Sequence, residues 1–335
     1  MPENARVKLD LAPRSFKPDS SLEPIYWVNQ TNTSDDVITQ IEAATSYLAE
    51  AHTKVPPKRV LAEALKLHQQ TQAILQGGKQ RLRQTRELLR IDSDLMAHAC
   101  VLLGDLGWDA KAMEYGTAAL IFAREAGTSE AIAWSAQAKT ARWQKRYVES
   151  AELARKGFEA SPPTPTRVEL AYREANAIAL FGDASRARSA LRRAELAAES
   201  LSTKDSSATV WSFSTERQAV FALSVAIHTG DPDSALCAVA TADAGWAAGN
   251  PKVLATWAQI RVGAGIVHLM KGSLDGAAEQ VNPIFELSPE LRIGTVIGYL
   301  ENLYRRLSKP SFANDKIANE LRQRIREFTS HGPLK

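Results

Sequence analysis

The chain has almost no cysteine and no long hydrophobic run. Its 335 residues include two cysteines, Cys100 and Cys237, which cannot form a disulfide framework, so we expect a reducing compartment. No stretch approaches the roughly 20 consecutive apolar residues that a membrane span needs. The first ten residues, MPENARVKLD, lack the apolar core of a secretory signal. We therefore predict a cytoplasmic protein without a membrane partner.

A surplus of one charge sign is also missing. Lysine and arginine total 41 against 38 aspartates and glutamates, a formal net charge of +3. That balance does not by itself predict a nucleic-acid or anionic-membrane partner. The apolar share of 44% and the charged share of 24% are ordinary for a globular chain. The length allows one large or two ordinary domains with a sizeable core.

Motifs for catalysis, metal binding and phosphate binding are absent from the sequence. It contains no HExxH, CxxC, GxSxG or GxxxxGK[ST] pattern, and its 6 histidines are scattered. We therefore predict no catalytic residue, no metal and no cofactor, and a non-enzymatic function. Because fold does not fix function, an enzyme built on a helical-repeat scaffold is kept as an alternative.

Helical signals dominate after residue 32. Residues 33–91 are predicted to form N-terminal helices. The stretch at residues 33–36 offers an N-cap and an acidic first turn, and Pro56-Pro57 and Gly77-Gly78 interrupt the helices. Residues 1–32 contain four prolines and no helical period, so we predict a partly ordered arm. Its one anchoring cluster is Ile25, Tyr26, Trp27 and Val28. Residues 291–335 are predicted to form two terminal helices that cap the preceding helices.

Five segments within residues 92–290 share one pattern. Each has a helix with small residues, a short turn usually containing glycine, and a second helix that opens on a small residue. The turns lie at residues 107–112, 145–150, 182–187, 230–235 and 272–277. Small residues let two helices approach closely, and glycine permits the tight reversal. We predict an all-α fold in which five antiparallel helix pairs stack into a right-handed superhelix.

These segments resemble tetratricopeptide repeats, whose period of ~34 residues is slightly shorter. The lead segment KLHQQTQAIL at 66–75 and the LLGDLG stretch at 102–107 resemble the C-terminal halves of tetratricopeptide-type transcriptional regulators of high-GC bacteria. The resemblance implies a sensor or regulator, acting in transcriptional or developmental control.

Those regulators usually carry an N-terminal Cro/CI-like helix-turn-helix, and this sequence departs from that pattern. The helices predicted at 35–52 and 57–76 are long, and Pro56-Pro57 separates them where that motif has a tight turn. We find no DNA-reading helix-turn-helix before residue 92, which argues against direct DNA binding. The chain resembles the sensor half of such a regulator standing alone.

The concave face of the predicted superhelix is the candidate binding site, because the first helix of each repeat lines the inner groove. Arginine and lysine can hold a carboxylate, asparagine matches a peptide backbone, and aromatic rings offer flat apolar area. Peptide-sensing tetratricopeptide receptors place asparagine and basic residues at such sites, so the resemblance supports three of the candidates in particular. The candidates are Ser135, Lys139, Arg142, Trp143, Tyr172, Asn176, Arg217 and His228, with Lys139, Arg142 and Asn176 supported by the resemblance.

This composition predicts a peptide, a small acidic and partly aromatic molecule, or a partner protein as the ligand. An ordinary solvated helix face, with Trp143 packed on the next repeat, is the competing interpretation of the same residues. A scaffold without a small ligand, using the outer faces and the N-terminal arm, is the alternative function. The apolar face formed by Ile297, Leu300, Leu303 and Tyr304 is a candidate homodimer seam. Three basic stretches, at 79–90, 186–193 and 322–326, are predicted to be solvated helix faces.

Overall fold

The chain is all helical in a computed structural model that describes residues 29–201, 209–289, 292 and 294–330, and those residues contain no strand. The predicted all-α class is confirmed. The helices are α2 (Asp35–Ala51), α3 (Pro57–Gln76), α4 (Leu82–Asp105), α5 (Asp109–Ala126), α6 (Ala131–Trp143), α7 (Tyr147–Ala160), α8 (Pro165–Phe181), α9 (Ala184–Glu199), α10 (Thr215–Thr229), α11 (Pro232–Ala247), α12 (Leu254–Met270), α13 (Leu274–Val281), η1 (Asn282–Glu286), α14 (Gly294–Leu307), η3 (Pro310–Phe312) and α15 (Lys316–Ser330). The predicted anchoring cluster of Ile25, Tyr26, Trp27 and Val28 lies outside the described residues. None of the described helices combines the length and the hydrophobicity that crossing a bilayer requires.

The helices α2 and α3 begin at residues that favour a helix start. The Ser34 side chain accepts a hydrogen bond from the Val37 amide at the start of α2, within the stretch where an N-cap was predicted. Pro57 occupies the first turn of α3, where its missing N–H costs nothing. The domain boundary that the sequence suggested between residues 91 and 92 lies inside α4. No proline or glycine occurs in α4 before Gly104, so nothing interrupts the helix there.

The turns between paired helices use a left-handed backbone at equivalent places. Gly107, Gly182, Gly230 and Gly272 have φ values of 78°, 101°, 75° and 80°, which glycine adopts without steric cost. In the second pair, Lys145 takes this conformation with φ 60°. The small residues that open the second helices are at most 1% exposed; they are Ala112, Ser150, Ala187, Ala235 and Ala277. Close helix approach is therefore the shared feature of the five pairs.

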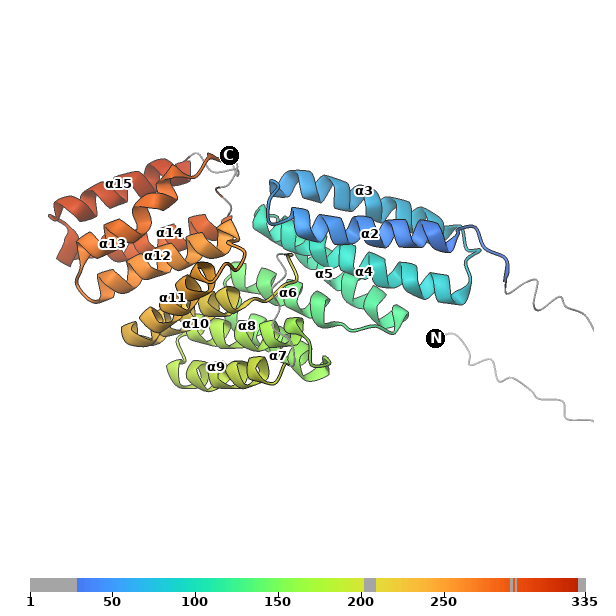
Figure 1. The fold of residues 1–335 in the computed structure, drawn as a ribbon, viewed down its shortest axis with the longest axis horizontal. Coiled ribbons are helices and arrows are strands. Elements are labelled where there is room, and N and C mark those ends of the chain that lie inside the picture. The colour runs from blue at the N-terminus through green and yellow to red at the C-terminus, as the bar shows by residue number, and fades with distance from the viewer. Residues whose placement is uncertain (1–28, 202–208, 290–291, 293, 331–335) are drawn as a thin grey trace, which may run out of the picture.

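Each helix that opens a pair also packs on the helix that opens the next pair. The first helices of successive pairs, α4, α6, α8, α10 and α12, contact one another in chain order, and α14 continues the series by packing on α12. Figure 1 shows the resulting row bending from α2 and α3 through α8 and α9 to α14 and α15. The bend brings side chains from early and late helices toward a common interior.

The C-terminal helices use their apolar face within the chain. Leu300 and Leu303 are fully buried in a cluster shared with α12 and α15. Ile297 and Tyr304 are partly buried against the same cluster. Of the four residues proposed for a homodimer seam, the two leucines are therefore covered by α12 and α15 within the chain.

Candidate functional site

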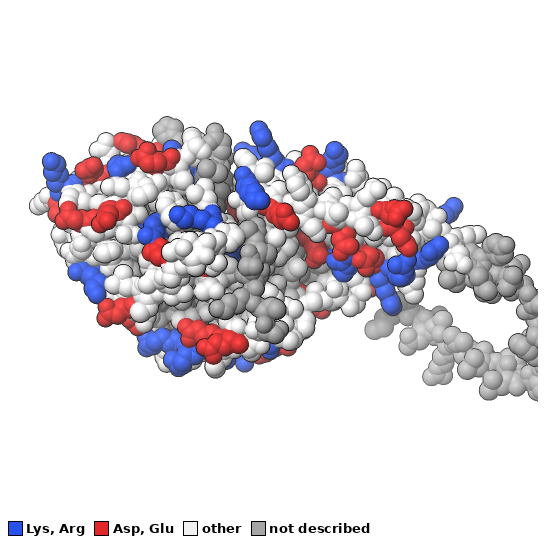
Figure 2. Space-filling view, viewed as in Figure 1, with Lys and Arg blue, Asp and Glu red and all other residues white. Residues whose placement is uncertain are grey.

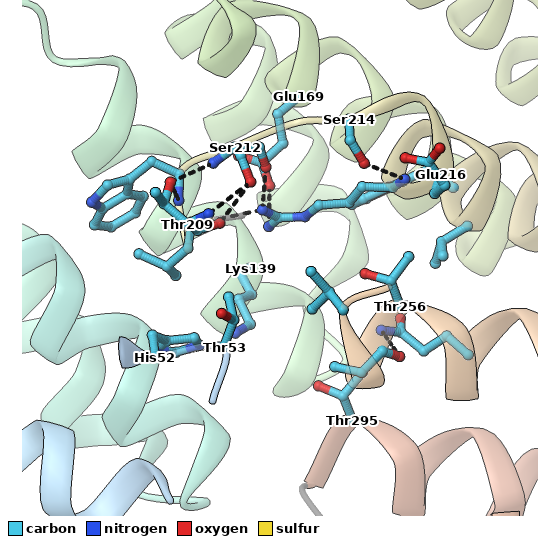
Figure 3. A pocket seen from close by; sticks show the side chains of 18 of the residues that line it. His52, Thr53, Lys139, Glu169, Thr209, Ser212, Ser214, Glu216, Thr256 and Thr295 are labelled. Carbon is cyan, nitrogen blue, oxygen red and sulfur yellow. Dashed lines mark hydrogen bonds and ion pairs between the residues drawn. The ribbon is translucent and has the colours of Figure 1, made fainter. Parts of the chain in front are cut away.

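Two neighbouring cavities lie on the inner side of the bent row. The smaller, of about 240 Å³, is lined by α4, α6, α8, α10, α12 and the loop at residues 209–214 (Figure 3). The larger, of about 800 Å³, is lined by the turns of the first two helix pairs and by α8, α10, α12, α14 and α15. Asp105, Arg142 and Thr295 line both cavities, so these three residues mark their junction.

A buried ion network fills one wall of the smaller cavity. The Glu169 carboxylate accepts hydrogen bonds from Ser135 at 3.0 Å, from Arg173 at 2.8 Å and from Arg217 at 2.7 Å. Burial acts to raise the pKa of Glu169, but the two arginines prevail and the net shift is downward. Burial lowers the pKa of Arg173 to about 10. Glu169 is therefore a carboxylate whose charge is compensated within the protein.

Arg217 has a second role in the same wall. Its guanidinium donates to the carbonyl oxygens of Val210 at 2.9 Å and Ser212 at 2.6 Å. The Val210 amide in turn donates to the carbonyl of Ala49 at 2.9 Å. Arg217 thus fastens the 209–214 loop between α10 and the end of α2, and its donors are committed to the fold.

Lys139 is also paired. Its Nζ lies 2.8 Å from a carboxylate oxygen of Asp105, and His52 Nε2 lies 3.9 Å from the same side chain. His52 Nδ1 is 3.1 Å from His98 Nε2. Burial, together with the charges of Lys139 and Arg217, lowers the pKa of His52 to about 3. His52 is therefore uncharged at neutral pH, and Asp105 is balanced by Lys139.

Arg142 is a cationic side chain at the junction of the two cavities. Among the described residues, its side chain forms no hydrogen bond and no ion pair, and its Nε is buried without a partner. Its guanidinium carbon lies 4.3 Å from the centre of the Trp143 ring. Burial lowers the pKa of Arg142, against the opposing influence of Tyr299, Tyr147 and Asp105. No acidic side chain of the described residues forms an ion pair with this cation at the cavity junction.

The charges around the smaller cavity do not cancel. Its cationic lining residues are Lys139, Arg142, Arg173 and Arg217, and its acidic ones are Asp105, Glu169 and Glu216. Glu216 accepts a hydrogen bond from Asn250 at 2.7 Å. One positive charge therefore remains, in a site where burial weakens screening. Such a site suits an anionic group.

The larger cavity has a more apolar wall. Trp143, Ile227, Ile266, Ile297 and Tyr299 contribute to it. A Cβ atom at Gly298 would lie 3.2 Å from the Trp143 ring, which shows how closely α14 approaches α6. His228 lines this cavity, and its Nδ1 lies 2.7 Å from the carbonyl oxygen of Ser224. Burial lowers the pKa of His228.

The predicted site residues divide into three groups. Ser135, Lys139, Arg142 and Arg217 line the smaller cavity, whereas Arg142, Trp143 and His228 line the larger. The remaining two, on α8, line neither, and their placement in the groove was wrong. Tyr172 is 4% exposed and packs against Phe213, with ring centres 5.4 Å apart. Asn176 is 3% exposed and donates its amide to Ser224 Oγ at 2.7 Å.

Sequence reasoning missed several residues that matter here. On α8 the side chains facing the cavity are Glu169 and Arg173, so the predicted face was out of register. Their opposite charges at i, i+4 spacing were the available signal. Thr295 and Tyr299 carried no signal, since the C-terminal helices were expected to cap the row rather than line its interior.

The described residues contain no group of three or more His, Cys, Asp and Glu side chains arranged to hold a metal ion. No protein-family model matches the chain. No curated protein is similar enough to the chain to count as a relative.

Proposed function

We propose that this chain is a non-enzymatic regulatory protein of the cytoplasm that binds an acidic ligand on the inner side of a tetratricopeptide-like solenoid. The packing of α4, α6, α8, α10 and α12 in chain order supports the stacked arrangement, as does the recurrence of the left-handed turn residue. A right-handed superhelix of such pairs places the first helices on the concave side. Transcriptional or developmental control is the setting that the resemblance suggests.

The larger cavity is the observation that carries this proposal. Its volume of about 800 Å³ lies in the range of small-molecule and cofactor sites, which are mostly apolar with a few polar groups. Apolar and aromatic side chains form much of its wall, and Arg142 supplies a charge. A short peptide or an acidic molecule with an apolar body fits this chemistry.

Ligand binding in this place would couple distant parts of the chain. The cavity joins the turns of the first two helix pairs to α14 and α15. A ligand that contacts both sides more favourably in one curvature of the row shifts the population toward that curvature. A partner that recognises an outer face would then sense the ligand.

Native mass spectrometry of the protein purified from the cells that produce it tests the proposal. The wild-type protein is expected to retain a ligand. Ile297→Trp, which fills the larger cavity, is expected to lose it. Ile121→Trp is the matched control, because Ile121 lies on α5 and is 51% exposed. Ligand-free wild-type protein, or equal retention by both variants, would contradict the proposal.

A scaffold that binds only a partner protein is a second candidate function. Trp108, Val148 and Phe181 are 58%, 52% and 60% exposed, and they lie at the turn ends of three successive helix pairs. Exposed apolar side chains at such equivalent turns favour contact with another protein. In the same experiment, this function predicts a protein-sized additional mass that survives Ile297→Trp and disappears in the double variant Trp108→Ser, Phe181→Ser.

A further inference from the structure

We infer that the ligand is an amphipathic monoanion: its carboxylate sits between Arg142 and the first turn of α14, and its apolar body lies in the larger cavity. This inference rests on the proposed function and specifies the ligand class. It depends on the charge balance at the cavity junction, on the position of the α14 N-terminus and on the wall of the larger cavity.

The side chains at the junction carry one more positive charge than negative charge. At the junction, Lys139 already neutralises Asp105 at 2.8 Å, which leaves the Arg142 guanidinium without an anionic partner. Its Nε is buried and has no hydrogen-bond acceptor among the described residues. A buried donor without an acceptor is unfavourable, and a carboxylate can bind a guanidinium through two parallel hydrogen bonds.

The start of α14 supplies a second set of donors. This helix begins at Gly294, and the N–H groups of a first helical turn have no acceptor within their own helix. A Cβ atom at Gly294 would lie 3.1 Å from the carbonyl oxygen of Asp105, so the α14 N-terminus stands directly beside the end of α4. Thr295 projects into the space that Lys139 faces from the opposite side (Figure 3). Helix N-termini favour anions.

The same junction disfavours a dianion such as phosphate. Lys139 already balances Asp105 there, so Arg142 is left to balance one negative charge and not two. One uncompensated arginine beside one neutralised acid matches a single carboxylate. This arrangement distinguishes the ligand by charge as well as by shape.

The larger cavity determines the rest of the ligand. Ile227, Ile266 and Ile297 face it together with the rings of Trp143 and Tyr299. Removing apolar surface of the ligand from water there favours binding. An aliphatic or aromatic body attached to the carboxylate therefore gains affinity, whereas a small inorganic anion does not.

Isothermal titration calorimetry with the full chain tests this inference. The probes are 3-phenylpropanoate, decanoate and N-acetyl-phenylalanyl-leucine, each compared with its carboxamide. We expect at least one acid to bind and its amide to bind at least roughly 10-fold more weakly, because the amide lacks the charge. The three probes distinguish an aromatic acid, a fatty acid and a peptide terminus as the source of the carboxylate. Inorganic phosphate is expected not to compete.

Substitutions distinguish the loss of a ligand contact from a general disturbance of the fold. Arg142→Met is expected to weaken the acid roughly 10- to 100-fold, and Arg142→Lys is expected to restore part of the loss because it restores the charge. Arg155→Met, on the outer face of α7 with a side chain 62% exposed, is expected to leave binding unchanged. Equal affinity of acid and amide, or unchanged binding by Arg142→Met, would overturn the inference.

The outcomes also separate this inference from the proposed function. Suppose that wild-type protein retains a ligand that Ile297→Trp loses, yet none of the three acids binds. Then the proposed function stands and the monoanion assignment fails. If Ile297→Trp and wild-type bind the acids equally, both the cavity and the assignment fail.

Discussion

Glu169 and Arg217 are joined by a 2.7 Å hydrogen-bonded ion pair, although 48 residues separate them in the chain. The pair connects α8 to α10, and Arg173 on α8 binds the same carboxylate oxygen at 2.8 Å. Two successive helix pairs are therefore connected through charge as well as through apolar packing.

Glu169→Gln is expected to destabilise the protein. Removing this carboxylate leaves Arg173 buried without its anion, and breaking a buried pair in this way costs about 3–5 kcal/mol. Urea denaturation followed by circular dichroism measures the change. Glu159→Gln is the matched control, because its pair with Arg155 is exposed and contributes at most about 0.5 kcal/mol as an i, i+4 helix pair. Equal losses in the two variants would mean that the network contributes no more than a surface pair.

The lowered pKa of His52 predicts that the protein loses stability as the pH falls. Burial, with Lys139 and Arg217, lowers its pKa from 6.5 to about 3. Between those pH values the unfolded chain binds this proton and the folded chain does not, so the contribution is complete above about pH 6.5 and declines as pH falls toward 3. His52→Gln is expected to flatten the stability curve there by at most about 5 kcal/mol.

The measurement is the free energy of unfolding at several pH values, compared between wild type and His52→Gln. Asp94 contributes with the opposite sign, because burial raises its pKa to about 6. Wild type and His52→Gln share the Asp94 contribution to the free energy of unfolding, so it cancels in the comparison. Parallel curves between pH 6.5 and 4 would show that His52 is not a buried neutral imidazole.

Lys145→Gly is expected to stabilise the protein by about 0.5–1 kcal/mol. Lys145 has φ 60° in a turn whose equivalents, Gly107, Gly182, Gly230 and Gly272, are glycines. A left-handed backbone costs a side chain roughly 1–2 kcal/mol, and part of this gain is offset by the greater entropy of glycine in the unfolded chain. Thermal unfolding measures the effect. Gly182→Ala, the reverse change at an equivalent position, is expected to lower the melting temperature. The prediction fails unless the two variants change the melting temperature in opposite directions.

Gly157→Ala tests close packing within the second and third pairs. Its Cβ atom would lie 2.6 Å from Trp134 Cβ and 3.0 Å from the Leu170 methyl groups. We expect a loss of about 1–3 kcal/mol, despite the higher helix propensity of alanine. Gly104→Ala is the control, because the nearest atom to its Cβ would be Thr140 Oγ1 at 3.4 Å. Denaturant titration that finds the two variants equally stable would contradict this packing.

The paired helices were predictable because their signals are local. Glycine at a turn and a small residue one turn later are visible in a single sequence, and all five small residues proved to be buried. The predicted boundary between residues 91 and 92 lies inside α4, where no local signal interrupts the helix. Figure 2 shows acidic and basic side chains interspersed on one face of the molecule, without a continuous basic surface. This distribution agrees with the nearly equal numbers of acidic and basic residues in the sequence. Within the basic stretches, Arg83 pairs with Asp35 and Arg193 with Glu174.

The site was only partly predictable because its geometry depends on long-range packing. Lys139 and Arg142 were found from helical spacing on α6. On α8, however, nearly every face is buried, so no polar side indicates which residues turn inward, and Tyr172 was chosen in place of Arg173. Thr295 comes close to Arg142 only because the row bends and brings α14 beside α4. No pattern in the sequence encodes that approach.

Arg142→Met is expected to separate stability from binding. An arginine partly withdrawn from water without an anion costs free energy, and methionine keeps the apolar stem against Trp143 while removing the charge. The cation–π contact at 4.3 Å opposes this gain, so the ligand-free variant is expected to be more stable by about 1 kcal/mol. A bound acid at 100 times its dissociation constant stabilises the wild-type protein by about 2.7 kcal/mol, and the variant by much less. Thermal shift with and without decanoate measures both terms. A ligand-free variant that is less stable than wild type would mean that Arg142 holds the fold together, and that its charge is not kept for a ligand.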